Sequence, residues 1–475
     1  MTWSRTQTRF IAATPEALFD ALSTPSLWPA FNDDVQSFEV VGAPALTGPG
    51  GPQRLALGDE VRVLPHTRVF GAVHGLTAPP ARITALVTDR ELEWTQDQPG
   101  GSTVQRWSLE PRGTGTLLTR STVTTGPLTP ALGPAFGGGL SSDLGRVAAR
   151  LALMVGVSDS TAASQPLVIV AGGSGYLGSR VTEELLARGR DVVVLTRSLR
   201  AGLPYRQAVW DGRTQGSWAE LFSDPRGVDV VNLTGYRIGD AGGAATMARM
   251  TDSRVNPTRA LVTAALNAGV TVKHWLQGSG GVMRANPDEP VVTESTPLDP
   301  RGEEVPGMSE LIRRWEDAVA DAPAESLTLM RTGIVLGRDA AAFKALRAVV
   351  SLGAGGSLAG GRQWVPWIHE DDWLSIARAA LGLEGLVALP GGPVVASAPN
   401  PVTNAELMRE LRARFAPGGL GIPAPKPLLK LGTGVLRKDP GVLTGSTRAV
   451  SSVLPVAGFV FGHPTLGPAL DDLLG

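Results

Sequence analysis

The sequence contains no cysteine, and it has only five lysines, five histidines and three tyrosines among its 475 residues. Without cysteine the chain cannot form disulfides, thiol nucleophiles, or cysteine-ligated zinc or iron–sulfur centres. The histidines lack the spacing typical of metal ligands, so we predict no metal site. A net charge of −1 gives no basic field that would attract DNA or RNA, and we expect no nucleic-acid partner.

Long hydrophobic runs are also missing. The first residues, MTWSRTQTRF, lack the apolar core of a signal peptide. No apolar stretch approaches the roughly 18 residues that a membrane-spanning helix requires. We therefore expect a cytoplasmic protein without a membrane span. Hydrophobic residues make up 43% of the chain, which is enough to build cores, and the length predicts more than one domain.

The stretch VSDSTAASQP, residues 157–166, is small, polar and ends in proline, which predicts an interdomain linker. Before it, Thr14 followed by Pro15 predicts a helix start. Alternating stretches predict half-buried antiparallel strands, namely SFEVV, DEVRV, ARITALV, RELEW and VQRWSLE. The region closes on a predicted helix whose apolar face comprises Leu140, Leu144, Val147, Ala148, Leu151 and Val155.

This order of elements resembles the SRPBCC or START-like helix-grip superfamily, in which a bent sheet wraps a long C-terminal helix. The stretch TPEALFDALSTPSLWPAFNDDV is similar to the first helices of that family. The resemblance covers residues 1–156 and implies an α+β domain that binds a small hydrophobic ligand in an apolar cavity. The residues themselves leave open whether the aromatic side chains line such a cavity or form an ordinary core, as Trp28, Phe31, Trp94 and Trp107 could do either.

After the linker, strand and helix patterns alternate. LVIV (167–170), DVVVLT (191–196), VDVVNLTG (228–235), TVKHWLQGSG (271–280) and LTLMRTGIVLG (327–337) are predicted strands. YLGSRVTEELLARG, which follows the first of them, is a predicted helix. Strands that alternate with helices predict an α/β Rossmann fold with a doubly wound parallel sheet.

Gly172, Gly175 and Gly178 stand between the first of these strands and its helix, where a dinucleotide-binding turn belongs. The first glycine permits the tight turn, the second lets a diphosphate approach the backbone, and the third lets the helix pack against the sheet. The next strand ends at Arg197, where an NAD site usually has an acid. A guanidinium can bind a 2′-phosphate with two hydrogen bonds, so we predict NADP(H) in preference to NAD(H).

The glycine turn, NLTG (232–235), Ser279 and WIHEDD (367–372) together resemble the extended short-chain dehydrogenase/reductases, which are NAD(P)-dependent epimerases, dehydratases and reductases. A poorly characterised epimerase-like subfamily is still more similar, through DSRVNPTRALVTAAL, LMRTGIVLGRD, GGRQWVPWIHEDD and SAPNPVTNAEL. Its small C-terminal domain, which would lie on the substrate side, is matched by VLPVAGFVFGHPTLGPALDDLL. We therefore predict an NAD(P)-binding Rossmann domain over residues 167–400 and the C-terminal domain over residues 401–475.

The resemblance implies a role for particular residues. The diphosphate would lie on Gly172, Gly175, Tyr176, Leu177 and Gly178, and the adenosine ribose would meet Arg197 and Ser198. Asp211 would lie near the adenine edge, and Leu233, Thr234 and Gly235 would line the dinucleotide groove. Arg331 would approach the nicotinamide from the following strand, and Ser279 would be the serine that hydrogen-bonds a substrate carbonyl or hydroxyl.

The sequence departs from that family at its acid–base pair, Tyr-x-x-x-Lys, which occurs nowhere in the chain. Alignment on RRWED (313–317) places Met308 and Ile312 at the two positions. The subfamily often has Tyr-Tyr-Gly just after the serine, but here that place reads Met283, Arg284, Ala285. A positioned acid–base contributes about 10²- to 10⁴-fold, so the loss weakens catalysis without abolishing it. The candidate replacements are Arg284, Glu310 and His369, each of which also has a purely structural interpretation.

Three functions remain open at this point. The first is an NADP(H)-dependent oxidoreductase or epimerase-like enzyme that acts on a small hydrophobic carbonyl or hydroxyl compound. The second is a non-catalytic NADP(H)-binding sensor or carrier of a hydrophobic ligand, which the missing tyrosine favours. The third is a structural or regulatory partner protein, for which the charge pattern marks no surface.

Overall fold

The structure is a computed structural model. It describes residues 2–42, 52–65, 79–98, 100–126, 143–156, 164–238, 240, 243–281, 284, 286–288, 290–351, 355–383, 387–416, 418–419, 421–423 and 441–474. Most of the predicted linker, residues 157–163, therefore lies outside the described residues, as does Leu140 of the predicted helix before it. The boundaries of the three domains stay predictions.

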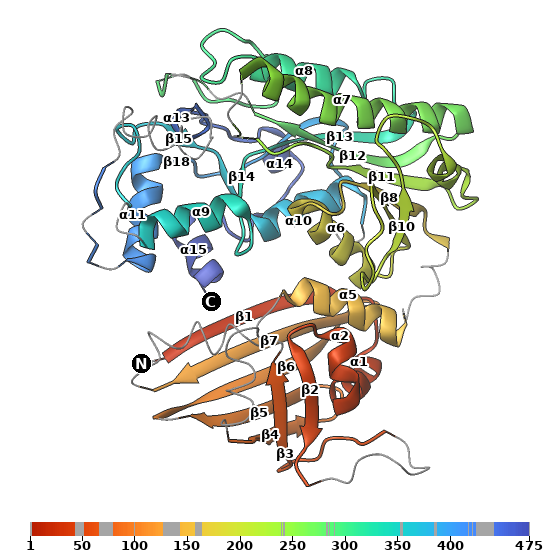
Figure 1. Ribbon diagram of the computed structural model, residues 1–475, viewed down its shortest axis with the longest axis vertical. Helices are drawn as coiled ribbons and strands as arrows, with labels where there is room; N and C mark the ends of the chain where they lie inside the picture. The colour runs from red at the N-terminus through yellow and green to blue at the C-terminus, as the bar shows by residue number, and fades with distance from the viewer. Residues whose placement is uncertain are drawn as a thin grey trace.

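The N-terminal region forms a seven-stranded antiparallel sheet in the order β1-β7-β6-β5-β4-β3-β2. Its strands are β1 (Thr2–Ile11), β2 (Val35–Val40), β3 (Glu60–Pro65), β4 (Ala81–Val87), β5 (Glu91–Gln98), β6 (Gly101–Arg112) and β7 (Gly115–Thr125). Its helices are α1 (Pro15–Leu22), a 3₁₀ turn η1 (Pro25–Leu27), α2 (Trp28–Phe31) and α5 (Leu144–Val155). The sheet curves under α5 in Figure 1, which confirms the predicted helix-grip fold.

The core of this region lies between the sheet and its helices. Trp28 is 1% exposed, and its ring centroid lies 4.9–5.4 Å from those of Phe31, Phe38, Trp94 and Trp107. Edge-on and tilted ring pairs of this kind stabilise a packed interior. Part of the apolar space under α5 is therefore filled by the protein's own rings. The predicted helix start is confirmed, since the Thr14 hydroxyl accepts a hydrogen bond from the Ala17 N–H.

The second region is built on a seven-stranded parallel sheet in the order β10-β9-β8-β11-β12-β13-β17, which confirms the predicted Rossmann fold. The strands are β8 (Leu167–Ala171), β9 (Val192–Thr196), β10 (Arg206–Val209), β11 (Val228–Asn232), β12 (Val272–Gly280), β13 (Ala324–Thr332) and β17 (Gly392–Ala396). The connecting elements are α6 (Tyr176–Ala187), η4 (Ser217–Ser223), α7 (Gly243–Ala268), α8 (Met308–Asp317) and α10 (Glu370–Ala380). Helices α7 and α8 cover one face of this sheet, whereas α6 and α10 cover the other (Figure 1).

One predicted strand was wrong in its extent. The run 327–337 is two strands, because the chain leaves the main sheet after β13 and continues as β14 (Ile334–Leu336), which pairs with β16 (Trp367–His369). Gly333 occupies the break, and a Cβ there would lie 2.4 Å from the Pro366 carbonyl oxygen. The close approach of the two backbones explains the change of direction, since only glycine leaves room for it.

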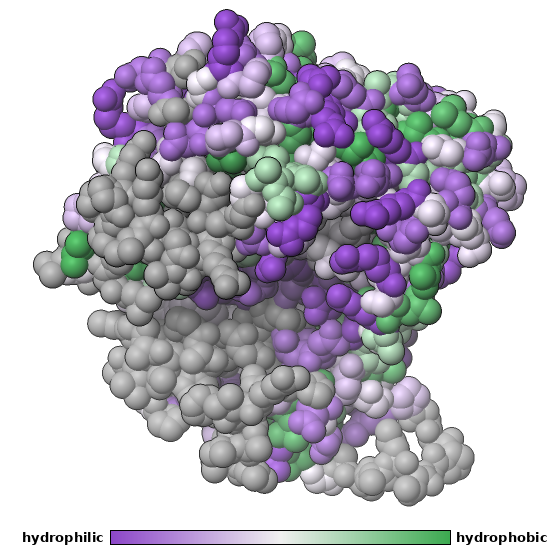
Figure 2. All heavy atoms as spheres, turned by 45° about the horizontal axis from the view of Figure 1, so that its top comes forward, coloured by the Kyte–Doolittle hydropathy of each residue, from purple (hydrophilic) through white to green (hydrophobic). Residues whose placement is uncertain are grey.

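The remaining elements form a small unit beside β14. They are α9 (Ala341–Val349), β15 (Trp364–Val365), β18 (Val402–Thr403), α11 (Asn404–Phe415), α13 (Gly441–Thr444), α14 (Val453–Val456) and α15 (Leu466–Leu474). Helices α9, α11 and α15 share an apolar cluster. Figure 2 shows hydrophilic residues interspersed with separate hydrophobic patches on the face that it presents. None of the helices in the described ranges has the length and apolar character needed to span a bilayer.

The two regions meet at α5 and α6, which pack against each other. The Ala12 N–H donates to the Ala187 carbonyl at 2.8 Å, and the Arg146 guanidinium binds Glu183 at 3.3 Å. Glu183 and Arg180 of α6 are 4% and 9% exposed, although both carry charge. The N-terminal region thus covers the outer side of the helix that follows the glycine turn.

Candidate functional site

The glycine turn between β8 and α6 has the geometry that its sequence predicts. Gly172 adopts φ +84°, and a Cβ on it would lie 2.6 Å from the Leu233 carbonyl group. A Cβ on Gly178 would lie 2.2 Å from the Gly172 oxygen, and one on Gly175 would lie 3.2 Å from the same oxygen. The fold therefore requires glycine at the first and third positions, because a side chain there would collide with backbone atoms. The second is tight but leaves the outer side of the turn open to a ligand.

Helix α6 begins directly on this turn, with Gly175 as its N-cap. Because glycine has no side chain, no capping oxygen occupies this end of the helix, and no acid stands in its first turn. Tyr176 and Leu177 are the first helical residues, as predicted for a diphosphate site, and they would offer backbone N–H groups. The side chain of Tyr176 points elsewhere, since its hydroxyl donates a hydrogen bond to Glu370. Burial, together with that carboxylate, raises the pKa of Tyr176 far above its ordinary value.

The predicted ribose-binding residues follow β9 at the same edge of the sheet. Arg197 and Ser198 are exposed, and the Ser198 backbone takes part in a turn with the Thr196 hydroxyl. Arg197 forms no ion pair with any acid in the described ranges. Its guanidinium is therefore available to an anion at this edge.

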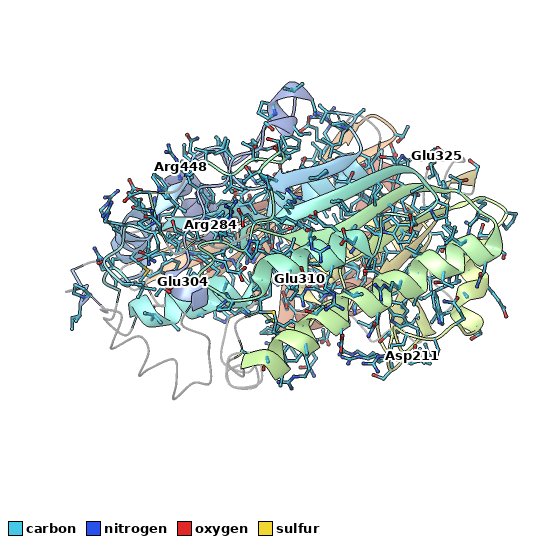
Figure 3. All side chains as sticks on the ribbon, turned by 90° about the horizontal axis from the view of Figure 1, so that it is seen from above. Asp211, Arg284, Glu304, Glu310, Glu325 and Arg448 are labelled. Atoms are coloured by element: carbon cyan, nitrogen blue, oxygen red, sulfur yellow. The ribbon has the colours of Figure 1, made fainter. Side chains whose placement is uncertain are left out.

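Asp211 lies in the loop after β10, where its carboxylate closes its own turn. Its oxygens accept from the Thr214 and Arg213 N–H groups at 2.8 and 2.7 Å and from the Thr214 hydroxyl at 2.7 Å. These hydrogen bonds, those from Thr214 foremost, lower the pKa of Asp211 to about 2. Its placement beside an adenine stays a prediction, but the carboxylate already has partners that hold the loop. Figure 3 shows Asp211 well away from Arg284 and Glu310.

The segment after β11 lies against the glycine turn. Asn232 is fully buried, and its side-chain oxygen accepts from the Thr234 N–H at 3.2 Å and from the Thr234 hydroxyl at 2.7 Å. This holds Leu233 against the Gly172 backbone. Gly235 leaves space for Arg254, whose guanidinium would meet a Cβ there at 2.9 Å. The structure therefore brings Gly172 and Leu233 together, as predicted for a dinucleotide groove.

Ser279 lies near the end of β12 and is 6% exposed. Its hydroxyl donates to Glu316 of α8 at 2.6 Å. Glu316 in turn receives two hydrogen bonds from Arg331, the register partner of Ser279 on β13, at 2.8 and 2.9 Å. Sequence reasoning missed Glu316. The available signal was its position eight residues after Met308, on the α8 face that would carry the acid–base pair.

Met308 and Ile312, which stand at the positions of the missing pair, are 3% and 2% exposed. They belong to an apolar cluster with Leu311 and Trp315. Neither side chain has a proton to donate. The helix face that carries Tyr and Lys in the resembling family is therefore hydrophobic here until it reaches Glu316.

The three predicted replacements have structural partners. The Arg284 guanidinium donates to the carbonyl oxygens of Asp299 and Arg301 at 2.8 and 2.6 Å, and it thereby holds a loop. Glu310 is exposed on the outer side of α8 and pairs with Arg313 at 2.8 Å (Figure 3). Met283 and Ala285, beside Arg284, lie outside the described residues.

His369 caps α10, because its Nδ1 accepts from the Asp371 N–H at 3.2 Å. Ligand atoms of His369, Asp371, His463 and Asp472 all lie within 4.8 Å of one another, a grouping that the scattered sequence positions do not reveal. However, an imidazole whose Nδ1 accepts a hydrogen bond carries its proton on Nε2, which here points to Asp472 at 3.3 Å. Arg9 also occupies Asp371 at 2.9 Å. The Asp371 N–H and the Arg9 guanidinium thus already bind two of the four groups.

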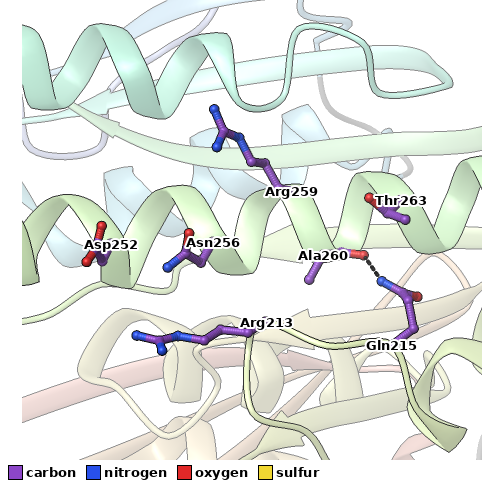
Figure 4. A pocket seen from close by; sticks show the side chains of 7 residues that line it. All are labelled: Arg213, Gln215, Asp252, Asn256, Arg259, Ala260 and Thr263. Carbon is purple, nitrogen blue, oxygen red and sulfur yellow. Dashed lines mark hydrogen bonds between the residues drawn. The ribbon is translucent and has the colours of Figure 1, made fainter.

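An open groove of about 470 Å³ lies between α7 and the loop after Asp211 (Figure 4). Its lining is mixed in charge and was not predicted; it comprises Arg213, Gln215, Asp252, Asn256, Arg259, Ala260 and Thr263. The Gln215 amide donates to the Ala260 carbonyl at 2.9 Å, which ties the loop to α7.

Three family models match successive parts of the chain. A model of the NAD dependent epimerase/dehydratase family matches residues 168–384, and a model for polyketide cyclase/dehydrase and lipid transport matches residues 2–153. A domain of unknown function, DUF1731, matches residues 424–473. These matches confirm the predicted resemblances on either side of the linker.

Individual relatives agree. The Epimerase family protein MT2273 of Mycobacterium tuberculosis is 31% identical over 313 residues, which are 64% of this chain and 96% of the mycobacterial protein. A crystal structure of human epimerase family protein SDR39U1 (isoform2) with NADPH is 25% identical, with a TM-score of 0.52, over 65% of this chain and 99% of that one.

A structure of the nucleoside-diphosphate sugar epimerase from Corynebacterium glutamicum is 20% identical, with a TM-score of 0.56. It covers 99% of this chain and 90% of its own, so the similarity extends over both regions of the fold. The chain belongs to the NAD dependent epimerase/dehydratase family of extended short-chain dehydrogenase/reductases, with a polyketide cyclase-like helix-grip domain before that unit and a DUF1731 domain after it.

Proposed function

We propose that this protein binds a nicotinamide nucleotide at the N-terminus of α6 and acts as an NADP(H)-dependent oxidoreductase or epimerase-like enzyme on a small hydrophobic carbonyl or hydroxyl compound. The observation that carries the proposal is the turn before α6, where side chains at Gly172 and Gly178 would collide with backbone. Unpaired N–H groups and the helix dipole at that end favour a diphosphate. The human relative whose structure is described with NADPH supports the same class of cofactor.

The residues present fit such a nucleotide. The diphosphate would lie on the backbone of Gly172, Gly175, Tyr176, Leu177 and Gly178, with Leu233 and Gly235 as the facing wall. Arg197 and Ser198 would meet the ribose, and the exposed guanidinium of Arg197 favours a 2′-phosphate there. Asp211 would hold the loop beside the adenine. The nucleotide, when bound, would supply a hydride donor or acceptor next to Ser279.

The chain's own groups would position the substrate more than they would transfer protons. Ser279 and Glu316 are a polar pair near the end of β12, and the hydrophobic side chain of Ile312, which shares an apolar cluster with Met308, lies beside that end of the strand. Such a wall suits an apolar compound with one oxygen function. Positioning of the reacting groups can itself supply a large part of a rate enhancement.

The test is to mix the purified protein with NADPH and a panel of hydrophobic ketones, aldehydes and enones, and to follow the absorbance of the reduced nicotinamide. We expect oxidation of NADPH with at least one of them, and its loss in Gly175→Asp, whose carboxylate would repel the diphosphate. Gly391→Asp is the matched control and should retain activity, because Gly391 is exposed and a Cβ there would lie at an ordinary contact distance of 3.5 Å from the Leu327 carbonyl oxygen. No turnover above background with any compound would count against an oxidoreductase.

A second function is favoured by the buried Met308 and Ile312, namely a nucleotide-loaded sensor or carrier of a hydrophobic ligand that performs no chemistry. Native mass spectrometry of the purified protein distinguishes the two. A retained nucleotide together with a retained hydrophobic ligand, without turnover in the panel above, would support the carrier. Turnover would support the enzyme.

A further inference from the structure

The hydrogen bond from Ser279 to Glu316 fixes the direction in which the serine can act. A serine hydroxyl has one proton and two acceptor lone pairs. The Ser279 proton is committed to the Glu316 carboxylate at 2.6 Å, a distance typical of a charge-assisted bond. Toward any other group, Ser279 then has only lone pairs to offer.

Glu316 is itself held in position by Arg331. The Arg331 Nε donates to one carboxylate oxygen at 2.9 Å, and its Nη2 donates to the other at 2.8 Å. The remaining guanidinium nitrogen, Nη1, donates to the Glu294 carbonyl at 3.0 Å. Each oxygen of the Glu316 carboxylate thus accepts a hydrogen bond from Arg331, and the oxygen that receives the Ser279 proton is held in place. The two side chains are 12% and 11% exposed, so little water competes with these bonds.

The surroundings supply no alternative donor on that helix face. Ile312 lies beside the end of β12, since a Cβ at Gly280 would be 3.7 Å from its side chain. Met308 lies one turn earlier in the same apolar cluster. Where the resembling family has a tyrosine that can donate to a carbonyl oxygen, this chain has only hydrocarbon and thioether.

We infer that Ser279 binds substrate as a hydrogen-bond acceptor, so that the site selects a ligand with a donor hydroxyl, an alcohol, over the matching ketone. Glu316 is a positioning residue that acts through Ser279, and Arg331 holds Glu316. This inference rests on the proposed function, because it concerns the substrate position of that same site. It reverses the assignment in which the serine donates to a carbonyl.

The experiment compares ligand affinities in complexes that cannot turn over. Calorimetry measures the affinities in two sets of titrations. Secondary alcohols from cyclohexanol to 1-phenylethanol are titrated into protein that is saturated with NADPH, and the matching ketones are titrated into protein that is saturated with NADP⁺. An alcohol can donate one hydrogen bond to Ser279 that the matching ketone cannot, and one such bond changes the affinity of a ligand about tenfold. We expect the alcohols to bind about tenfold more tightly than the ketones, and Ser279→Ala to remove that preference while it leaves NADPH affinity unchanged.

Two double variants test the role of the carboxylate. Glu316→Leu with Arg331→Met removes the pair as a unit and frees the Ser279 proton, so the preference should move toward the ketone. Such a replacement of a buried ion pair is often neutral for stability. Glu310→Leu with Arg313→Met removes a similar pair from the exposed side of α8 and should keep the preference for the alcohol.

The outcomes separate this inference from the proposed function. Equal affinities, tighter ketone binding in the unmodified protein, or binding of neither series by a protein that does bind NADPH would overturn the inference alone. Failure to bind either nucleotide would overturn the proposed function itself. A preference that survives in the Glu316→Leu/Arg331→Met protein would show that Glu316 does not direct Ser279.

Discussion

Replacement of Gly172 by alanine tests the turn on which the nucleotide site depends. The residue adopts φ +84°, and the left-handed region costs an ordinary residue about 1–2 kcal/mol. The new methyl would also lie 2.6 Å from the Leu233 carbonyl carbon and oxygen, which are backbone atoms that cannot rotate away. Overpacking of this kind costs about 1–3 kcal/mol more. We expect Gly172→Ala to lose about 2–5 kcal/mol of unfolding free energy.

Gly202→Ala is the matched control. Gly202 adopts φ +77°, but a Cβ on it would have no atom within 4 Å. This variant should therefore lose only the conformational part, about 1–2 kcal/mol, and should bind NADPH normally. Urea denaturation gives the stabilities, and fluorescence titration gives the affinity, which should fall at least tenfold in Gly172→Ala alone. Equal stability losses in the two variants, with equal NADPH affinities, would refute the reasoning.

Three further predictions follow from single contacts. Arg197→Asp should weaken NADPH binding about 10- to 100-fold and leave NADH binding little changed, as measured by titration. Arg62→Asp, an exposed change in β3, should change neither affinity. Partial desolvation raises the pKa of Asp371, but the Arg9 guanidinium outweighs this and lowers the folded pKa below the ordinary 3.8. The stabilisation is therefore present above 3.8 and is lost as the pH falls through the lower, folded pKa. Arg9→Met should lower the melting temperature near neutral pH and make its further fall during acid titration smaller, because this carboxylate then has no ion pair left to lose, and an unchanged profile would contradict the pairing. Trp28→Ala should cost about 3–5 kcal/mol in urea unfolding, and a loss below 1 kcal/mol would show that the rings are loosely packed.

Much of the fold could be predicted because most of its strands are either alternating apolar and polar stretches or short, continuous apolar runs. The five alternating stretches in the N-terminal region all became strands, and the apolar runs after the linker became the central parallel strands. Two strands that the alternation did not mark are β1 and β7. The buried positions of these strands include Arg5, Arg120, Thr122 and Thr124, so no apolar alternation appears in the sequence.

The contact between the N-terminal region and α6 could not be predicted from local sequence patterns either. Arg180, Glu183 and Glu184 read as an exposed charged face of α6, yet all three are buried where the N-terminal region packs on that helix. Local pairs within the helix meet part of their charge, but Arg146 and Arg378 reach Glu183 and Glu184 only through the tertiary arrangement.

The candidate site divides in the same way. The glycine turn could be predicted because three local residues and their context define it. The Ser279–Glu316–Arg331 network could not, since it joins β12, α8 and β13 across the sheet. The absence of Tyr-x-x-x-Lys was visible in the sequence, but what replaces it depends on which side chain the register places next to the serine.

Binding of a phosphorylated nicotinamide nucleotide at the turn before α6 is tested by isothermal titration of the purified protein. We expect one molecule of NADPH to bind per chain and NADH to bind at least tenfold more weakly, because only NADPH can meet Arg197 through a 2′-phosphate. The absence of measurable heat, and of any thermal stabilisation, with either nucleotide would contradict it.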